Sequence, residues 1–152
     1  MCAQTILLTG SLVSAIVIVF SSCQKNSNDI ISSQQNLEGT WAITGISSDR
    51  AYDFNGDGRS ETNIYGTYSN CQQDIILVFN SGGSGQIRQG CNAGWQAIAW
   101  RLTNNNRTLS ISLPGDELAL SIFQLDEYTI RGTDPVYVDG NNFNVTYTFQ
   151  RR

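Results

Sequence analysis

Oxygen-bearing side chains between Asp53 and Glu61 are the groups whose spacing best suits a specific chemistry. The chain reads D-F-N-G-D-G-R-S-E there, which matches the first nine positions of a calcium-binding loop. The twelfth position, normally a bidentate Glu, is Ile64, so we expect modest affinity and a structural calcium ion. The alternative, a surface loop rich in Asx turns, stays open. The candidate ligands are the side chains of Asp53, Asn55, Asp57 and Glu61 and the main-chain carbonyl of Arg59.

The sequence offers few candidate catalytic residues. The chain has no His, which removes the commonest general base and metal ligand. The visible carboxylate pairs, Asp116-Glu117 and Asp126-Glu127, fall at expected turns, where solvated acids have no reason for a raised pKa. We therefore expect a protein that is not an enzyme. A net charge of -4, with scattered basic residues, also argues against nucleic-acid binding.

Aromatic side chains offer a second kind of site. A long connection between the first two expected strands, from Ser47 to Gln73, contains several tyrosines, and long loops often carry function. Together with one tryptophan, these rings would form a platform for a glycan or another flat ligand, or else cap the fold as core; both readings stay open. The residues are Tyr52, Tyr65, Tyr68 and Trp95.

The elements that must position these groups read as β-strands. After Leu37, short strand-like runs alternate with turn residues, and no window shows apolar residues at helical spacing. The connections are short enough to force antiparallel neighbours. The expected strands are Gly39–Ser47, Asp74–Phe79, Gly85–Gln89, Trp95–Leu102, Thr108–Leu113, Leu118–Leu125, Tyr128–Thr133 and Asn142–Gln150.

Alternation within these runs predicts one apolar face. Leu109, Ile111 and Leu113 alternate with serines, and the last strand repeats the pattern from Phe143 to Phe149. Closing about eight such strands buries that face and removes both open edges. The fold class is therefore all-β: a single small antiparallel up-and-down β-barrel over residues 37–152, expected to be a monomer.

The first residues predict export and lipid anchoring. The apolar run from Ile6 to Phe20 has the character of a signal peptide and is shorter than the roughly 20 residues of a membrane span. It ends in Ser21-Ser22-Cys23, which resembles the lipobox of bacterial lipoproteins. Residues 1–22 would be removed, Cys23 would carry acyl chains in the lipid bilayer, and residues 23–36 would form a flexible polar tether. The alternatives are a simple cleaved signal and an uncleaved anchor. The expected location is the bacterial cell envelope, at the outer membrane.

Two cysteines remain for the folded domain. Cys2 leaves with the signal and Cys23 takes the lipid, so Cys71 and Cys91 are left as a pair. In an oxidising compartment a disulfide is the expected outcome. The alternative of a redox or metal pair lacks a C-x-x-C spacing and any His.

A family resemblance rests on both ends of the domain. Gly39-Thr40-Trp41 resembles the G-x-W signature of lipocalin and calycin barrels, and Arg151 shares the inward face of Phe149 near the C-terminus. In those barrels a basic residue of the last strand covers the signature Trp and closes one end. The pattern is similar to the lipocalin-like domain of small bacterial lipoproteins.

The resemblance implies a non-catalytic barrel that binds a small apolar or amphipathic ligand or serves as an accessory module in the envelope. A cavity lined by Trp41, Trp100 and Phe149 would favour ligand binding, and a filled interior would favour the alternative. Trp100 shares one face of its strand with Ile98 and Leu102, so we expect it to pack in the interior. The alternative is a surface module that recognises a glycan or a protein through the tyrosine-rich loop.

Overall fold

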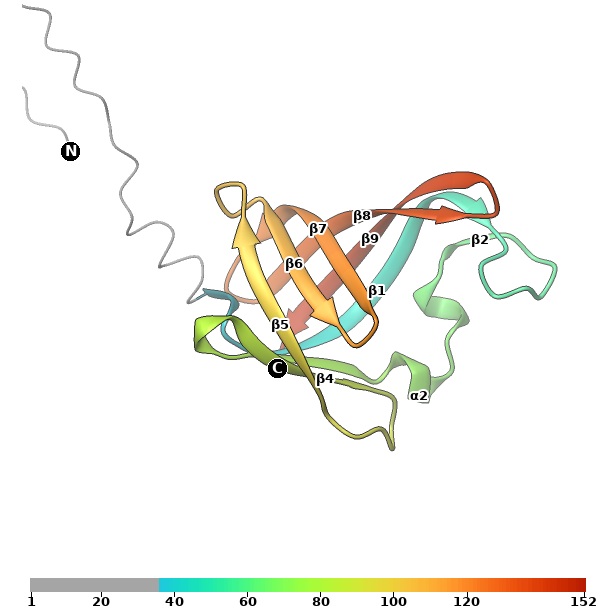
Figure 1. Ribbon diagram of the computed structural model, residues 1–152. Helices are drawn as coiled ribbons and strands as arrows, with labels where there is room; N and C mark the ends of the chain where they lie inside the picture. The colour runs from blue at the N-terminus through green and yellow to red at the C-terminus, as the bar shows by residue number, and fades with distance from the viewer. Residues whose placement is uncertain (1–35) are drawn as a thin grey trace, which may run out of the picture.

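A computed structural model of the chain describes residues 36–152 (Figure 1). The predicted signal peptide, the acylated Cys23 and all but the last residue of the predicted tether lie outside the described residues. Within residues 36–152, no helix is both long enough and apolar enough to cross a membrane.

Eight strands form a closed antiparallel barrel, which confirms the predicted fold class (Figure 1). Consecutive strands are neighbours, and the last strand pairs with the first to close the cylinder. A ninth, short strand, β2 (Glu61–Asn63), adds to the outer end of β1. The barrel strands are β1 (Gly39–Tyr52), β3 (Ile75–Phe79), β4 (Ser84–Gln89), β5 (Gln96–Thr103), β6 (Thr108–Leu113), β7 (Asp116–Leu125), β8 (Thr129–Val138) and β9 (Asn141–Arg151).

The predicted inward face is the core. Leu109 and Ile111 of β6 are completely buried, and Phe143, Val145 and Phe149 of β9 are buried as well. Alternate residues of β9, such as Asn144 and Gln150, are exposed. Since each fully buried large apolar side chain contributes about 1.5–3 kcal/mol, this single interior supplies most of the favourable free energy of folding.

Trp41 and Arg151 close one end of the barrel. The two residues are register partners on β1 and β9, and the Arg151 guanidinium carbon lies 4.3 Å from the centre of the Trp41 ring. Trp41 is completely buried, and its indole N–H donates to the Leu37 carbonyl at 2.8 Å. Arg151 also donates to the Glu38 carbonyl at 2.8 Å. The cation–π contact predicted from the sequence is present.

The structure requires a glycine at position 39, the first position of the G-x-W pattern. Its φ of +131° lies in the region that L side chains rarely adopt, and a Cβ there would collide with the Arg151 guanidinium. A glycine lets the basic side chain cross the first strand on its way to Trp41.

The opposite end of the barrel is split between β7 and β8. These strands pair only over residues 121–125 of β7 and 130–133 of β8, from the partners Ser121 and Thr133 to the partners Leu125 and Ile130. Beyond that point residues 116–120 pair with β6 alone, and residues 134–138 pair with β9 alone. The two ends diverge visibly in Figure 1. Pro135, which has no N–H to donate to a neighbour, lies in the stretch of β8 that has no β7 partner.

Two strand predictions were too short. β1 continues to Tyr52, five residues past the predicted end at Ser47, and β8 continues through Pro135 to Val138. The connection after β1 is also ordered, because it contains β2, a 3₁₀ turn (Tyr65–Thr67) and the short helix α2 (Asn70–Gln73). A second 3₁₀ turn, Ser81–Gly83, links β3 to β4.

Candidate functional site

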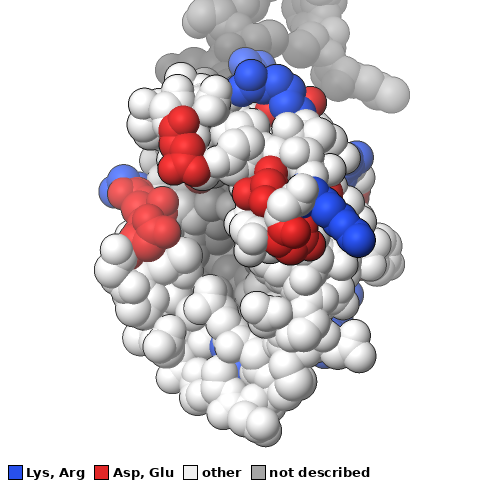
Figure 2. Space-filling view, turned by 90° about the vertical axis from the view of Figure 1, so that its right-hand side faces the viewer, with Lys and Arg blue, Asp and Glu red and all other residues white. Residues whose placement is uncertain are grey.

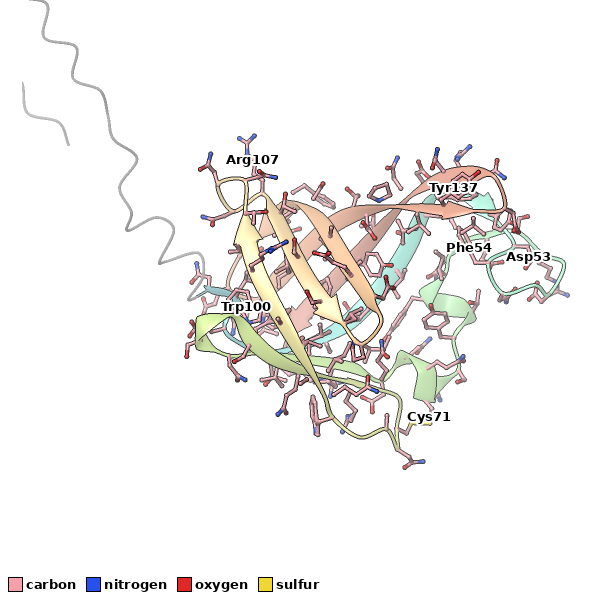
Figure 3. The ribbon with its side chains drawn as sticks, viewed as in Figure 1. Asp53, Phe54, Cys71, Trp100, Arg107 and Tyr137 are labelled. Atoms are coloured by element: carbon pink, nitrogen blue, oxygen red, sulfur yellow. A yellow bond between two sulfur atoms is a disulfide. The ribbon has the colours of Figure 1, made fainter. Side chains whose placement is uncertain are left out.

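The barrel contains a cavity of about 700 Å³ at the split end. Its inner part is apolar, because it is walled by inward-facing side chains of β1, β3, β4, β6 and β9. In Figure 3, Phe54 and Tyr137, which line this cavity, lie at the end of the molecule opposite Trp100. The inner wall includes Ile43, Leu77, Ile87, Ile111, Val145 and Phe149.

The cavity lies away from the two buried tryptophans. Phe149 lines the cavity, but Trp41 and Trp100 do not. Trp100 packs on Phe79, with ring centres 5.4 Å apart, and its indole N–H donates to the Ser84 carbonyl at 2.9 Å. Both tryptophans therefore fill the closed end, and the free volume lies at the other end.

Polar groups surround the cavity mouth where β7 and β8 separate. Asp116, Glu117, Asp134, Gln89 and Tyr147 line the cavity together with the apolar wall. Figure 2 looks at this end of the molecule and shows acidic side chains beside a hollow. The apolar inner wall would suit the apolar body of an amphipathic ligand, and the polar mouth would suit its head group.

Burial perturbs two of these groups. Desolvation raises the pKa of Asp134, and the nearby Asp116 carboxylate raises it further. Desolvation also raises the pKa of Tyr147 to about 12, with smaller contributions from Asp134, Tyr68 and Asp116. The Tyr147 hydroxyl is neutral at physiological pH, as an unperturbed tyrosine is, and burial extends its neutral range upward, so it is available as a hydrogen-bond donor inside the cavity.

Sequence reasoning missed Asp134, Tyr147 and Phe54 as cavity residues. For Asp134 a signal existed: Ile130, Gly132, Asp134 and Val136 alternate on the inward face of β8, so the carboxylate occupies a core position. The predicted strand stopped at Thr133, before that residue.

The four aromatic residues do not form one surface, and Tyr52, Tyr65 and Tyr68 pack against the core, which agrees with the alternative that they cap the fold. Tyr68 lines the cavity. Tyr52 instead donates to Asp139 at 2.5 Å and packs on Phe54, with ring centres 5.2 Å apart. Tyr65 is anchored by its hydroxyl, which lies 2.9 Å from the Ile43 carbonyl.

Trp95 lies apart from the cavity wall. Its side chain is 47% exposed, with the Arg88 guanidinium over its ring at 5.5 Å. Of the four aromatic residues singled out in the sequence, only Tyr68 thus faces the cavity.

The acidic loop brings its three carboxylates together. Oxygens of Asp53, Asp57 and Glu61 lie within 4.8 Å of one another. Main-chain N–H groups hold the loop, since Asp53 accepts from Gly56 and Gly58 at 2.7 Å each. The Asn55 side chain joins the same network of Asx turns, accepting from the Asp57 N–H at 3.1 Å, and the Asp57 carboxylate accepts from the Arg59 N–H at 2.9 Å. This geometry agrees with both readings of the loop, so calcium binding stays a prediction.

Calcium binding predicts a measurable stabilisation. Adding millimolar calcium to the chelated domain should raise its melting temperature by a few degrees, because a ligand present at tenfold its Kd contributes about 1.4 kcal/mol. Scanning calorimetry provides the measurement. The double variant Asp53→Asn, Asp57→Asn should lose the response. An unchanged melting temperature in the parent protein, or an equal rise in the variant, would show that this loop does not bind calcium.

A disulfide links the two sides of the open end. Cys71 of α2 and Cys91 of the β4–β5 connection are bonded, with their Cα atoms 4.9 Å apart, which confirms the predicted pairing. Arg88 and Asp74 form an ion pair beside it, at 2.9 Å. The bond therefore attaches the segment that carries Tyr68 to the barrel wall.

Comparison with known proteins gives the chain a family without an assigned activity. No curated protein matches the sequence. Residues 21–150 match the sequence model of a family described as a domain of unknown function, DUF5004. That match spans most of the chain, and the chain is therefore a member of the DUF5004 family.

Proposed function

We propose that this chain is a non-catalytic, lipid-anchored envelope protein whose lipocalin-like barrel binds a small apolar or amphipathic molecule. The observation that carries the proposal is the cavity of about 700 Å³, which has an apolar inner wall and a polar mouth. Binding sites for small molecules have this size and this combination of walls. A barrel of eight strands is just wide enough for either packed side chains or one small ligand, and here the split end leaves room for the ligand.

The lipocalin-like assignment is supported by the closed end. Gly39, Trp41 and Arg151 stand in the arrangement that the family resemblance implies. The proposed anchor is supported by the sequence alone, through the apolar run and Cys23. Acyl chains there would hold the barrel near the bilayer, where apolar ligands concentrate.

Recognition of a glycan or a protein through the tyrosine-rich loop is the weaker alternative. Tyr52 and Tyr65 use their hydroxyl groups within the fold, and Trp95 does not line the same cavity. The structure thus gives the loop no flat aromatic platform of the predicted composition.

Binding of the neutral fluorescent probe N-phenyl-1-naphthylamine tests the proposal. We expect a saturable rise in fluorescence at one probe per protein. Leu113→Trp, which adds volume on the cavity wall near the mouth, should weaken binding about tenfold or more. Ala97→Phe, an exposed position on β5, serves as the matched control and should bind as the parent does.

Thermal melting of both variants shows whether they are folded. No saturable binding by the parent, or equal binding by Leu113→Trp, would contradict the cavity as the site. In that case the surface-recognition alternative would be favoured.

A further inference from the structure

Two carboxylates lie at the cavity mouth, on the parts of β7 and β8 that do not pair with each other. Asp116 begins β7 and lies on the same face as Leu118 and Leu120, which point into the barrel. Asp134 lies on the inward face of β8, opposite Val145 in the register with β9. Both residues line the cavity.

These carboxylates lack a basic partner. Among the described residues 36–152, no Arg or Lys lies within ion-pairing distance of Asp116 or Asp134. Glu117 is the third acid on the mouth, and its partner Arg101 is 3.7 Å away on the exposed outer surface. Of the described residues that line the cavity, none is Lys, Arg or His. The mouth therefore offers two uncompensated negative charges to whatever enters.

We infer that the cavity selects amphiphiles with a positively charged head group, such as a protonated primary amine, and holds that charge between Asp116 and Asp134. This inference rests on the proposed function, because it names the ligand class of the same cavity. The apolar tail would lie along Ile111 and Val145, and the head would remain at the gap between β7 and β8.

The negative charge of the mouth favours cationic over anionic head groups. An ammonium group placed near two carboxylates gains Coulomb energy in a partly desolvated site, where the effective dielectric constant is far below that of water. Desolvation and, after it, repulsion from Asp116 raise the pKa of Asp134, and a bound cation would relieve that repulsion. A fatty-acid carboxylate would meet two like charges with no cation to pair with. The walls suit the alkyl tail of either ligand equally, so the head group decides.

Competition among three ligands of equal chain length tests the inference. Decylamine, decanol and decanoate are each titrated against bound N-phenyl-1-naphthylamine in low-salt buffer without divalent cations, below their micelle concentrations. We expect decylamine to compete about tenfold better than decanol, and decanoate about tenfold worse. Added salt should reduce both differences by screening the mouth charges.

The double variant Asp116→Asn, Asp134→Asn should erase the order of the three ligands and leave decanol unchanged. Glu127→Gln, which neutralises one carboxylate beyond the end of β7 at the closed end, is the control and should keep the order. The asparagine variant removes like-charge repulsion, so its melting temperature should not fall.

Each outcome has one meaning. If decanoate competes as well as decylamine, or if the asparagine variant keeps the parent's order, the charge selection is wrong. If neither the probe nor decanol binds the parent, the failure belongs to the proposed function. Loss of binding for all three ligands in the folded asparagine variant would also contradict the inference, because the carboxylates would then shape the cavity itself.

Discussion

Replacing Trp41 with alanine should lower the free energy of unfolding by about 3–5 kcal/mol, as large-to-small changes at buried tryptophans do. Trp41 is completely buried at the closed end, so the substitution leaves a cavity there. It also removes the ring beneath the Arg151 guanidinium, a contact that contributes about 1–2 kcal/mol when desolvated. Urea unfolding followed by circular dichroism gives the measurement. A marginally stable domain would lose a large part of its total stability.

Trp95→Ala provides the matched control for that experiment. The same side chain is deleted, but from a site that is half exposed, so the expected loss is below about 1 kcal/mol. Similar losses for the two variants would show that Trp41 is not the residue that closes the barrel.

Removing the disulfide is the second change with a large expected effect. The bond closes a loop with a sequence separation of 20 residues, for which the chain-entropy model gives a contribution of about 3 kcal/mol. The double variant Cys71→Ser, Cys91→Ser should therefore melt about 10 °C or more below the parent. Scanning calorimetry of both proteins measures the difference.

Reductant supplies the control for the disulfide. It should bring the melting temperature of the parent down to that of the serine variant and should leave the variant unchanged. A serine variant that melts with the untreated parent would show that the crosslink adds nothing to stability.

The strand pattern of the barrel was predictable, and the shape of its interior was not. Alternation fixes which residues of β6 and β9 face inward, because a one-residue shift would expose the whole apolar set. The resemblance at Gly39, Trp41 and Arg151 was enough to predict how one end closes. Both signals are local or depend on paired positions that a single sequence displays.

The split between β7 and β8 depends on packing that a single sequence does not display. The predicted strand ended at Thr133, two residues before Pro135, and proline is confined in sheets to positions where no neighbour needs its N–H. In the structure β8 continues through Pro135 with β9 as its only neighbour, and the cavity mouth lies at that position. Trp41 and Trp100 pack in the closed end and the free volume lies at the split end, because the distribution of volume along a barrel follows from three-dimensional packing.

The turns of the acidic loop were also predictable from the sequence. Its hydrogen-bonded form is readable from the spacing of Asp53, Asn55 and Asp57, and the structure contains those turns. A calcium site and a loop of Asx turns share these hydrogen bonds, and titration with calcium distinguishes the two.

Intermolecular nuclear Overhauser effects between probe and protein show whether a small apolar molecule binds inside the barrel. The protein would carry ¹³C-labelled Ile, Leu and Val methyl groups, with unlabelled N-phenyl-1-naphthylamine as ligand. We predict contacts from the probe to the methyl groups of Leu77, Ile111 and Val145, which line the cavity. Contacts restricted to Ile76 and Val78, which are not part of the cavity wall, or no contacts under saturating probe, would contradict the account.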